Sequence, residues 1–114
     1  MAGTVTIYHN PRCGKSRQTL ELLRQRGLEP VVIEYLKTPP TAAGLAAILA
    51  KLGKRPGDIL RAKEAAEAGV SPDLPDDALI AAMVANPIII ERPIVVAGDH
   101  ARVGRPPESV LEIL

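Results

Sequence analysis

Aromatic residues and cysteine are both scarce in this sequence, and each scarcity excludes a class of function. The 114 residues include no Trp, no Phe, two Tyr and one Cys. Stacking on nucleobases needs aromatic side chains, so the composition argues against a nucleic-acid binder. One cysteine cannot form an internal disulfide, so a disulfide-stabilised scaffold is excluded. The core must be built from aliphatic side chains.

The chain also lacks a strong charge imbalance and a long apolar run. Fourteen basic and 13 acidic residues give a net charge of +1, which argues against a general binder of nucleic acid or membrane surfaces. No apolar run approaches the roughly 20 residues of a membrane span, and the N-terminus has no signal-peptide pattern. We therefore expect a cytoplasmic protein that does not bind membranes. We also expect no metal and no bound cofactor. Its length predicts a single domain over residues 1–114.

Apolar patterning predicts an α/β protein with the order β-α-β, helical insert, β-β-α. Alternating and short apolar runs predict strands, and apolar residues at helical spacing predict the helices. In the last helix, opened by Pro106 or Pro107, we expect Val110, Leu111 and Leu114 to face inward. Residues 88–90 form either a buried extended segment or the start of a strand. The expected strands are residues 4–8, 31–35, 93–97 and 100–104; the expected helices are residues 16–26, several within an insert at about 41–87, and one at the C-terminus.

The only cysteine, Cys13, lies where the first strand gives way to the first helix. Helix N-termini present unpaired N–H groups and a positive dipole end, both of which favour an anion. Lone cysteines are most often small buried hydrophobes, but Arg12, Lys15 and Arg17 make these surroundings electropositive. Gly14 allows the backbone to turn close to a ligand, and Lys15 adds positive charge that suits an anion. We predict a reactive thiolate that meets a small anion here.

Two polar neighbours are candidates for tuning the thiol. His9 lies four residues before Cys13; it either favours the thiolate or shuttles a proton, or it simply faces solvent at a strand end. Ser16 occupies the position of the second thiol in a Cys-x-x-Cys site. Its hydroxyl could donate to the thiolate, or Ser16 could be an ordinary helix-start serine.

Three arginines stand beside apolar or proline-bounded segments: Arg61, Arg92 and Arg105. Each alone is typical of a solvated surface charge. A guanidinium is nonetheless the preferred donor to a tetrahedral oxyanion, because its fork is bidentate and always charged. Their importance depends on whether they converge in space, which sequence spacing does not show.

The residues around Cys13 resemble the nucleophile motif of the glutaredoxin-linked arsenate reductases. The resembling stretch is His-Asn-Pro-Arg-Cys-Gly-Lys-Ser-Arg-Gln-Thr-Leu at residues 9–20. Further matches follow in order over nearly the whole chain, at residues 35–40, 59–61, 86–88, 92–95 and 104–106.

This resemblance implies a thioredoxin-like fold with a mixed four-stranded sheet, a helical insert and a cis-proline at Pro93. It implies that Cys13 attacks arsenate, that Arg61, Arg92 and Arg105 bind the oxyanion, and that His9 and Ser16 tune the thiol. Because the chain has no second cysteine, glutathione would attack the arsenic adduct. Glutaredoxin would then reduce the mixed disulfide at Cys13, and the product would be arsenite.

One departure leaves alternatives open. Lys15 stands where the best-known arsenate reductases carry a threonine, which alters the loop. Related proteins include Spx-like transcription regulators that bind RNA polymerase, although these usually carry Cys-x-x-Cys and Ser16 argues against such a dithiol switch. The other alternative is a glutathione-dependent thiol oxidoreductase with a different substrate.

Overall fold

The computed structural model describes residues 4–114, which form two compact units. One unit combines the residues up to Thr38 with Arg92–Leu114, and the other is Pro39–Glu91. The second unit contains the segment predicted as a helical insert at about 41–87. The assignment of residues 1–114 to a single domain stays a prediction.

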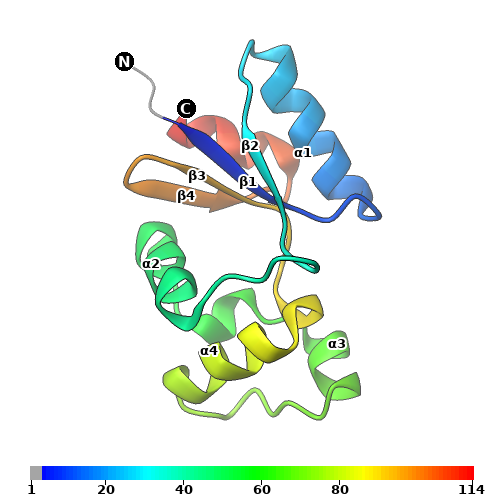
Figure 1. The fold of residues 1–114 in the computed structure, drawn as a ribbon, viewed down its shortest axis with the longest axis vertical. Coiled ribbons are helices and arrows are strands. Elements are labelled where there is room, and N and C mark those ends of the chain that lie inside the picture. Colours follow the sequence, from blue (N-terminus) through cyan, green and yellow to red (C-terminus); the bar gives the residue numbers. More distant parts are fainter. Residues whose placement is uncertain (1–3) are drawn as a thin grey trace. The chain divides into compact units, whose positions relative to one another are not determined.

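The first unit is built on a mixed four-stranded sheet, as predicted (Figure 1). Its strands lie in the order β2-β1-β3-β4, and β1 pairs in parallel with β2 and antiparallel with β3. A tight turn joins β3 to β4 as an antiparallel hairpin. The strands are β1 (Val5–His9), β2 (Val31–Glu34), β3 (Ile94–Ala97) and β4 (His100–Val103).

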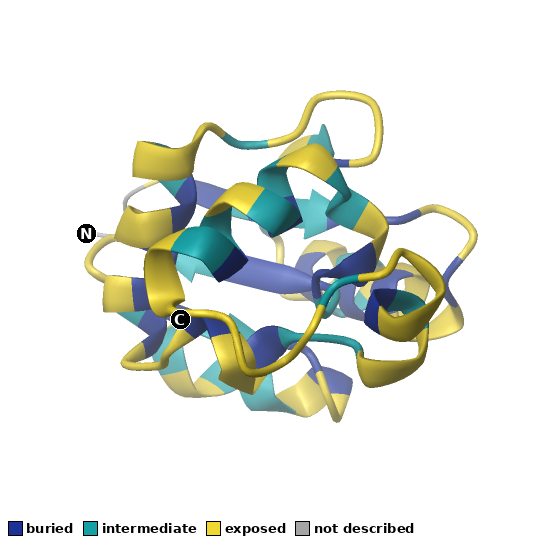
Figure 2. Cartoon of the chain, turned by 90° about the horizontal axis from the view of Figure 1, so that it is seen from below, coloured by how far each residue is buried: buried dark blue, intermediate teal, exposed yellow. Residues whose placement is uncertain are grey.

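The core of this unit is aliphatic, as the composition requires. Strand residues alternate between the two faces of a sheet, so Val5 and Ile7 point the same way and are buried with Val95. Helix α1 (Gly14–Gln25) adds Leu23, and the 3₁₀ helix η3 (Pro107–Ile113) adds Val110. Figure 2 shows buried residues along the strands and the inward turns of the helices, with exposed residues on outer turns and loops.

The C-terminal helix differs from the sequence prediction. Its turns are 3₁₀ rather than α, which places residues three apart above one another. Val110 is fully buried and Leu111 partly buried, but Leu114 is 48% exposed. The expectation that Leu114 faces inward is wrong, because the 3₁₀ helix ends at Ile113 before it.

The second unit is helical. It contains α2 (Ala42–Leu52), η1 (Pro56–Ile59), α3 (Ala62–Glu67), α4 (Asp76–Ala85) and η2 (Pro87–Ile89). Helix α2 begins as the sequence predicts, because the Thr41 hydroxyl accepts the Gly44 N–H at 3.0 Å. It ends at Gly53, whose φ of 67° is left-handed.

Residues 88–90 were predicted to be a buried extended segment or the start of a strand, and neither prediction holds for all three residues. Residues 88 and 89 lie in η2, and only Ile90 is extended, where it forms an isolated antiparallel bridge with Leu60.

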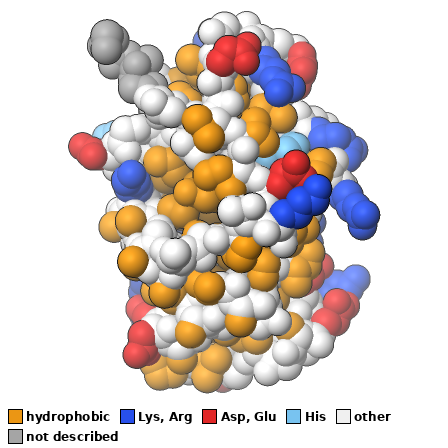
Figure 3. Space-filling model, in the orientation of Figure 1, with side chains coloured by type: hydrophobic (Ala, Val, Ile, Leu, Met, Phe, Trp, Pro, Cys, Tyr) orange, Lys and Arg blue, Asp and Glu red, His pale blue; other side chains and the backbone are white. Residues whose placement is uncertain are grey.

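Across residues 4–114, no helix is both long and apolar enough to cross a bilayer. Acidic and basic side chains are interspersed on the face drawn in Figure 3, in keeping with the near-neutral net charge.

Gly104, the residue after β4, lies very close to α1 and to the residue before β3. A Cβ atom on Gly104 would lie 2.6 Å from Thr19 Oγ1 of α1 and 2.8 Å from Pro93 Cγ. The Gly104 N–H donates to the Pro93 carbonyl at 2.9 Å. The absence of a side chain at Gly104 therefore lets the end of β4 pack directly against α1 and the start of β3.

We expect Gly104→Ala to lower the free energy of unfolding by about 1–3 kcal/mol, since added volume in a packed site forces its neighbours to shift. Chemical denaturation monitored by circular dichroism measures this change. Gly57→Ala is the matched control, because a Cβ there meets no atom within 4 Å. Equal stability of both variants would contradict the steric account.

Candidate active site

A turn stabilised by local hydrogen bonds joins β1 to α1 and contains Cys13. The Cys13 N–H donates to the Asn10 carbonyl at 3.0 Å. Asn10 Oδ1 accepts the Arg12 N–H at 3.0 Å, and the Arg17 guanidinium donates to the Pro11 carbonyl at 2.9 Å. Asparagine commonly closes turns through such side-chain bonds. These three bonds fix Cys13 at the start of the helix.

Cys13 is the N-cap residue of α1, so its sulfur lies beside the positive end of the helix. The first turn of α1 contains no acidic residue that would offset this field. Burial alone raises the pKa of the Cys13 thiol, but its neighbours outweigh that effect and the pKa is lowered. The neighbours that stabilise the thiolate are the Ser16 N–H, the Arg92 guanidinium and the Lys15 N–H.

Two of the three predicted arginines meet at the sulfur. The Arg92 side chain hydrogen-bonds Cys13, and Arg105 Nη2 lies 3.7 Å from Cys13 Sγ. Arg105 Nε also donates to the Arg92 carbonyl at 2.9 Å, which couples the two arginines. Each precedes a cis peptide bond, at Arg92–Pro93 and Arg105–Pro106. The resemblance implied only the first of these bonds.

Arg61 belongs to the helical unit and is described there by itself. It is the N-cap residue of α3, its N–H donates to the Ile89 carbonyl at 2.8 Å, and its guanidinium lies 3.1 Å from the Glu64 carboxylate. Its role in binding an oxyanion stays a prediction.

His9 is buried, so the interpretation of a solvent-facing histidine is wrong. The residue is 6% exposed, and its Nδ1 lies 2.6 Å from Ser16 Oγ. Ser16 is fully buried and also accepts the Asn10 N–H at 3.0 Å. The Ser16 hydroxyl therefore links the end of β1 to the first turn of α1 by hydrogen bonds, while the Ser16 N–H stabilises the Cys13 thiolate.

The charge of His9 is set by its surroundings. Burial is the main cause that lowers its pKa, Glu34 opposes this by raising it, and Arg24 and Arg17 lower it further. Glu34 is the residue that pairs with His9 in the parallel register of β1 and β2. The lowered pKa favours a neutral imidazole at the end of β1.

Gly14 and Lys15 form the start of α1, and both are exposed. Sequence reasoning pointed to the Lys15 charge, whereas in the structure the Lys15 backbone makes the contacts. Its N–H stabilises the thiolate, and its carbonyl accepts a hydrogen bond from the Thr19 hydroxyl at 2.8 Å. Thr19 was missed by that reasoning, as was the part that Asn10 plays in the turn. The Asn-Pro pair in the motif could have indicated Asn10, since it is typical of turn starts.

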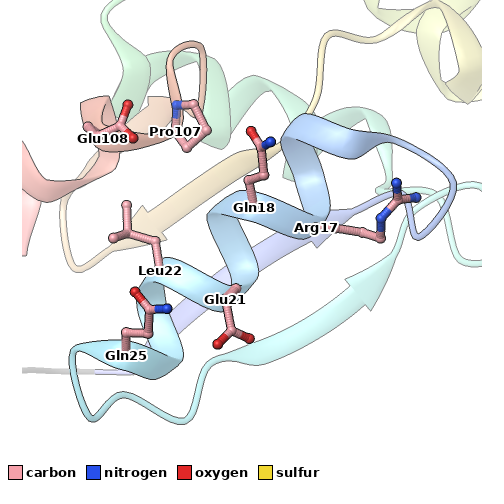
Figure 4. Close-up of a pocket in the computed structure, with 7 residues that line it drawn as sticks. All are labelled: Arg17, Gln18, Glu21, Leu22, Gln25, Pro107 and Glu108. Atoms are coloured by element: carbon pink, nitrogen blue, oxygen red, sulfur yellow. The ribbon is translucent and has the colours of Figure 1, made fainter.

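A small cavity, which we call the turn cavity, lies against this turn. Its volume is about 230 Å³, and it is lined by His9, Asn10, Pro11, Arg12, Glu34, Leu36 and Lys37. A second cavity of about 540 Å³ lies between α1 and η3, and Cys13 is among the lining residues of neither cavity. There Gln18 and Leu22 rise from α1 toward Pro107 and Glu108 (Figure 4).

Comparisons with known proteins show which family this chain resembles in sequence and in fold. The model of the ArsC family matches residues 8–113. The chain is 51% identical to the uncharacterized protein YfgD of Escherichia coli K12, covering all of this chain and 99% of that protein. It is 49% identical to an arsenate reductase of Rhizobium meliloti, covering 97% of this chain and 81% of that enzyme. A solved structure of an arsenate reductase from Vibrio cholerae superimposes with a TM-score of 0.89 at 48% identity, over the full length of both chains.

We expect Arg92→Met to raise the pKa of Cys13, because it removes a cation that stabilises the thiolate. Below its pKa, a thiol loses about tenfold in thiolate fraction for each unit by which the pKa rises. The pH dependence of alkylation by iodoacetamide measures the shift. The midpoint should move to higher pH and the rate at pH 7 should fall about three- to tenfold. Arg102→Met is the matched control, since Arg102 pairs with Glu112. An unchanged midpoint in Arg92→Met would refute the assignment.

Proposed function

Because the chain belongs to the ArsC family, we propose that it is an arsenate reductase whose nucleophile is the Cys13 thiolate. One observation carries the proposal: a thiol with a lowered pKa lies at a helix N-terminus and contacts two arginines. A guanidinium pair beside a thiolate suits a substrate that is a small tetrahedral anion. Relatives that are 48–49% identical are named arsenate reductase, which points to arsenate as the anion.

In the first step, the Cys13 thiolate attacks the arsenic atom of arsenate. A sulfur–arsenic bond forms, and one arsenate hydroxyl group gains a proton and leaves as water. Arg92 and Arg105 offset the negative charge that gathers on the remaining oxygens. The N–H groups that lower the Cys13 pKa also keep the sulfur deprotonated before attack.

The second step needs an external thiol, which we propose is glutathione. Its thiolate attacks the adduct, a sulfur–sulfur bond forms with Cys13, and the sulfur–arsenic bond breaks. The electron pair of that bond stays on arsenic, which leaves as arsenite. Glutaredoxin then reduces the mixed disulfide and restores the Cys13 thiol. The single cysteine supports this scheme, because the chain has no second thiol to resolve the adduct. Reduced glutathione is abundant in the cytoplasm, which we propose as the compartment.

The alternatives predict different outcomes in the same experiments. A glutathione-dependent oxidoreductase with another substrate would reduce small disulfides but leave arsenate unchanged. An Spx-like regulator would co-purify with RNA polymerase and would show neither activity.

We expect purified protein to oxidise NADPH when arsenate, glutathione, glutaredoxin and glutathione reductase are all present. Omission of arsenate, glutathione or glutaredoxin should abolish the signal, and Cys13→Ser should be inactive. Absence of turnover with Cys13 shown to be reduced would reject the proposal.

We also expect Arg92→Lys to lower kcat/KM for arsenate about 10- to 150-fold. Lysine keeps the charge but loses the bidentate fork, and a hydrogen bond to a charged group is worth about 1.5–3 kcal/mol. Arg102→Lys makes the same exchange at an arginine paired with Glu112 and should retain activity. Steady-state kinetics at varied arsenate separate the two variants; equal losses would indicate a general effect of the exchange.

A further inference from the structure

We propose that the turn cavity binds the co-substrate thiol, a short peptide with two carboxylates and one ammonium group, as glutathione has. The proposal rests on the proposed function, since it names where that function takes its reducing thiol. It assigns binding roles to Arg12, Lys37 and Glu34, which the reaction at Cys13 does not otherwise use.

The position of the cavity suits a thiol that must reach Cys13. Asn10, Pro11 and Arg12 line it, and these are the first three residues of the turn that Cys13 completes. Arg12 and Cys13 are consecutive, so their Cα atoms are about 3.8 Å apart. Cys13 does not itself line the cavity, so the sulfur of the bound peptide must extend past Arg12 to Cys13 or to an adduct on it.

The charges around the cavity complement a peptide of this kind. Arg12 and Lys37 provide two cations for the two carboxylates, and Glu34 provides an anion for the ammonium group. Lys37 Nζ and Glu34 Oε1 lie 3.5 Å apart, and their side chains are 80% and 42% exposed. Exposed pairs of this kind contribute little to stability, so a ligand can replace the contact at small cost.

The remaining lining fits the body of the peptide. Pro11 and Leu36 offer apolar contacts to methylene groups. The volume of about 230 Å³ lies below the roughly 300–1,000 Å³ of typical ligand pockets. The cavity therefore suits part of a tripeptide and is too small for a nucleotide cofactor.

His9 gives this cavity a group that can accept a proton. Its Nδ1 is bonded to Ser16, so a ligand would meet the imidazole at its other edge, which carries Nε2. An incoming thiol must lose its proton before it attacks, and a neutral imidazole can take that proton. The thiolate then attacks, and the proton stays on His9 until it passes to solvent.

Thiol–disulfide exchange without arsenic tests the cavity directly. The reduced Cys13 thiolate attacks oxidised glutathione, one sulfur–sulfur bond breaks as another forms, and glutathione thiolate leaves. The reference probe is 3,3′-dithiodipropionate, which has the same net negative charge at neutral pH but no peptide or ammonium group. Each rate constant is divided by the rate constant of the same disulfide with free 2-mercaptoethanol, which removes differences between leaving groups. The ratio of these normalised constants reports recognition of the peptide rather than of charge.

In the unmodified protein, we expect this ratio to lie well above one. Arg12→Ala and Lys37→Ala should each lower it about fivefold, as expected for the loss of one exposed charge contact. Changes in the reactivity of Cys13 affect both probes and cancel. Arg26→Ala is the matched control, because Arg26 is exposed and lies at the opposite end of α1; it should leave the ratio unchanged.

A ratio near one in the unmodified protein, or a ratio that neither Arg12→Ala nor Lys37→Ala lowers, would overturn the proposal. Failure of the proposed function gives a different result. If arsenate is not a substrate, NADPH oxidation with arsenate is absent while selectivity for oxidised glutathione remains. If only the cavity is wrongly assigned, arsenate turnover persists, and the selectivity is either missing or unaffected by Arg12→Ala and Lys37→Ala.

Discussion

The stabilisation of a buried thiolate is the constraint on which the rest of the first unit depends. Cys13 is 8% exposed, and burial by itself would keep its sulfur protonated. The N–H groups of Lys15 and Ser16 can reach the sulfur only if α1 begins at Gly14. Arg92 and Arg105 can reach it only if β3 and the end of β4 lie close to α1. The contact of Gly104 with Thr19 and Pro93 allows that approach.

The same elements give the loop two chemically different sides. On one side, the segments that flank β3 and β4 bring Arg92 and Arg105 to the sulfur, which suits an oxyanion. On the other, the end of β2 brings Glu34 toward His9 through the parallel register. Because β1 lies between β2 and β3 in the sheet, the loop that follows β1 is accessible to both neighbours. In the proposed function, arsenate and glutathione would both have to reach this one sulfur.

Local patterns predicted the elements well and their mutual contacts poorly. The alternation of Val5 and Ile7 indicated β1, and Thr41 and Gly53 marked both ends of α2. The burial of Ser16 and Thr19 was not predicted, because serine and threonine at the start of a helix are usually exposed or act as caps. Leu114 was predicted to face inward with Val110 and Leu111 on a terminal helix, yet the 3₁₀ helix ends one residue before it.

The sequence by itself determined that the chain has one cysteine, and it predicted the order of the elements and the family resemblance. Each of these depends on residue identity or on short-range spacing. Only the tertiary structure decided that Arg92 and Arg105 meet Cys13 and that His9 is buried against Ser16. Arg105 is 92 positions from Cys13 along the chain. Contacts at such separation are fixed by sheet order, strand register and close packing, which act through three-dimensional distance and leave no periodic trace in the sequence.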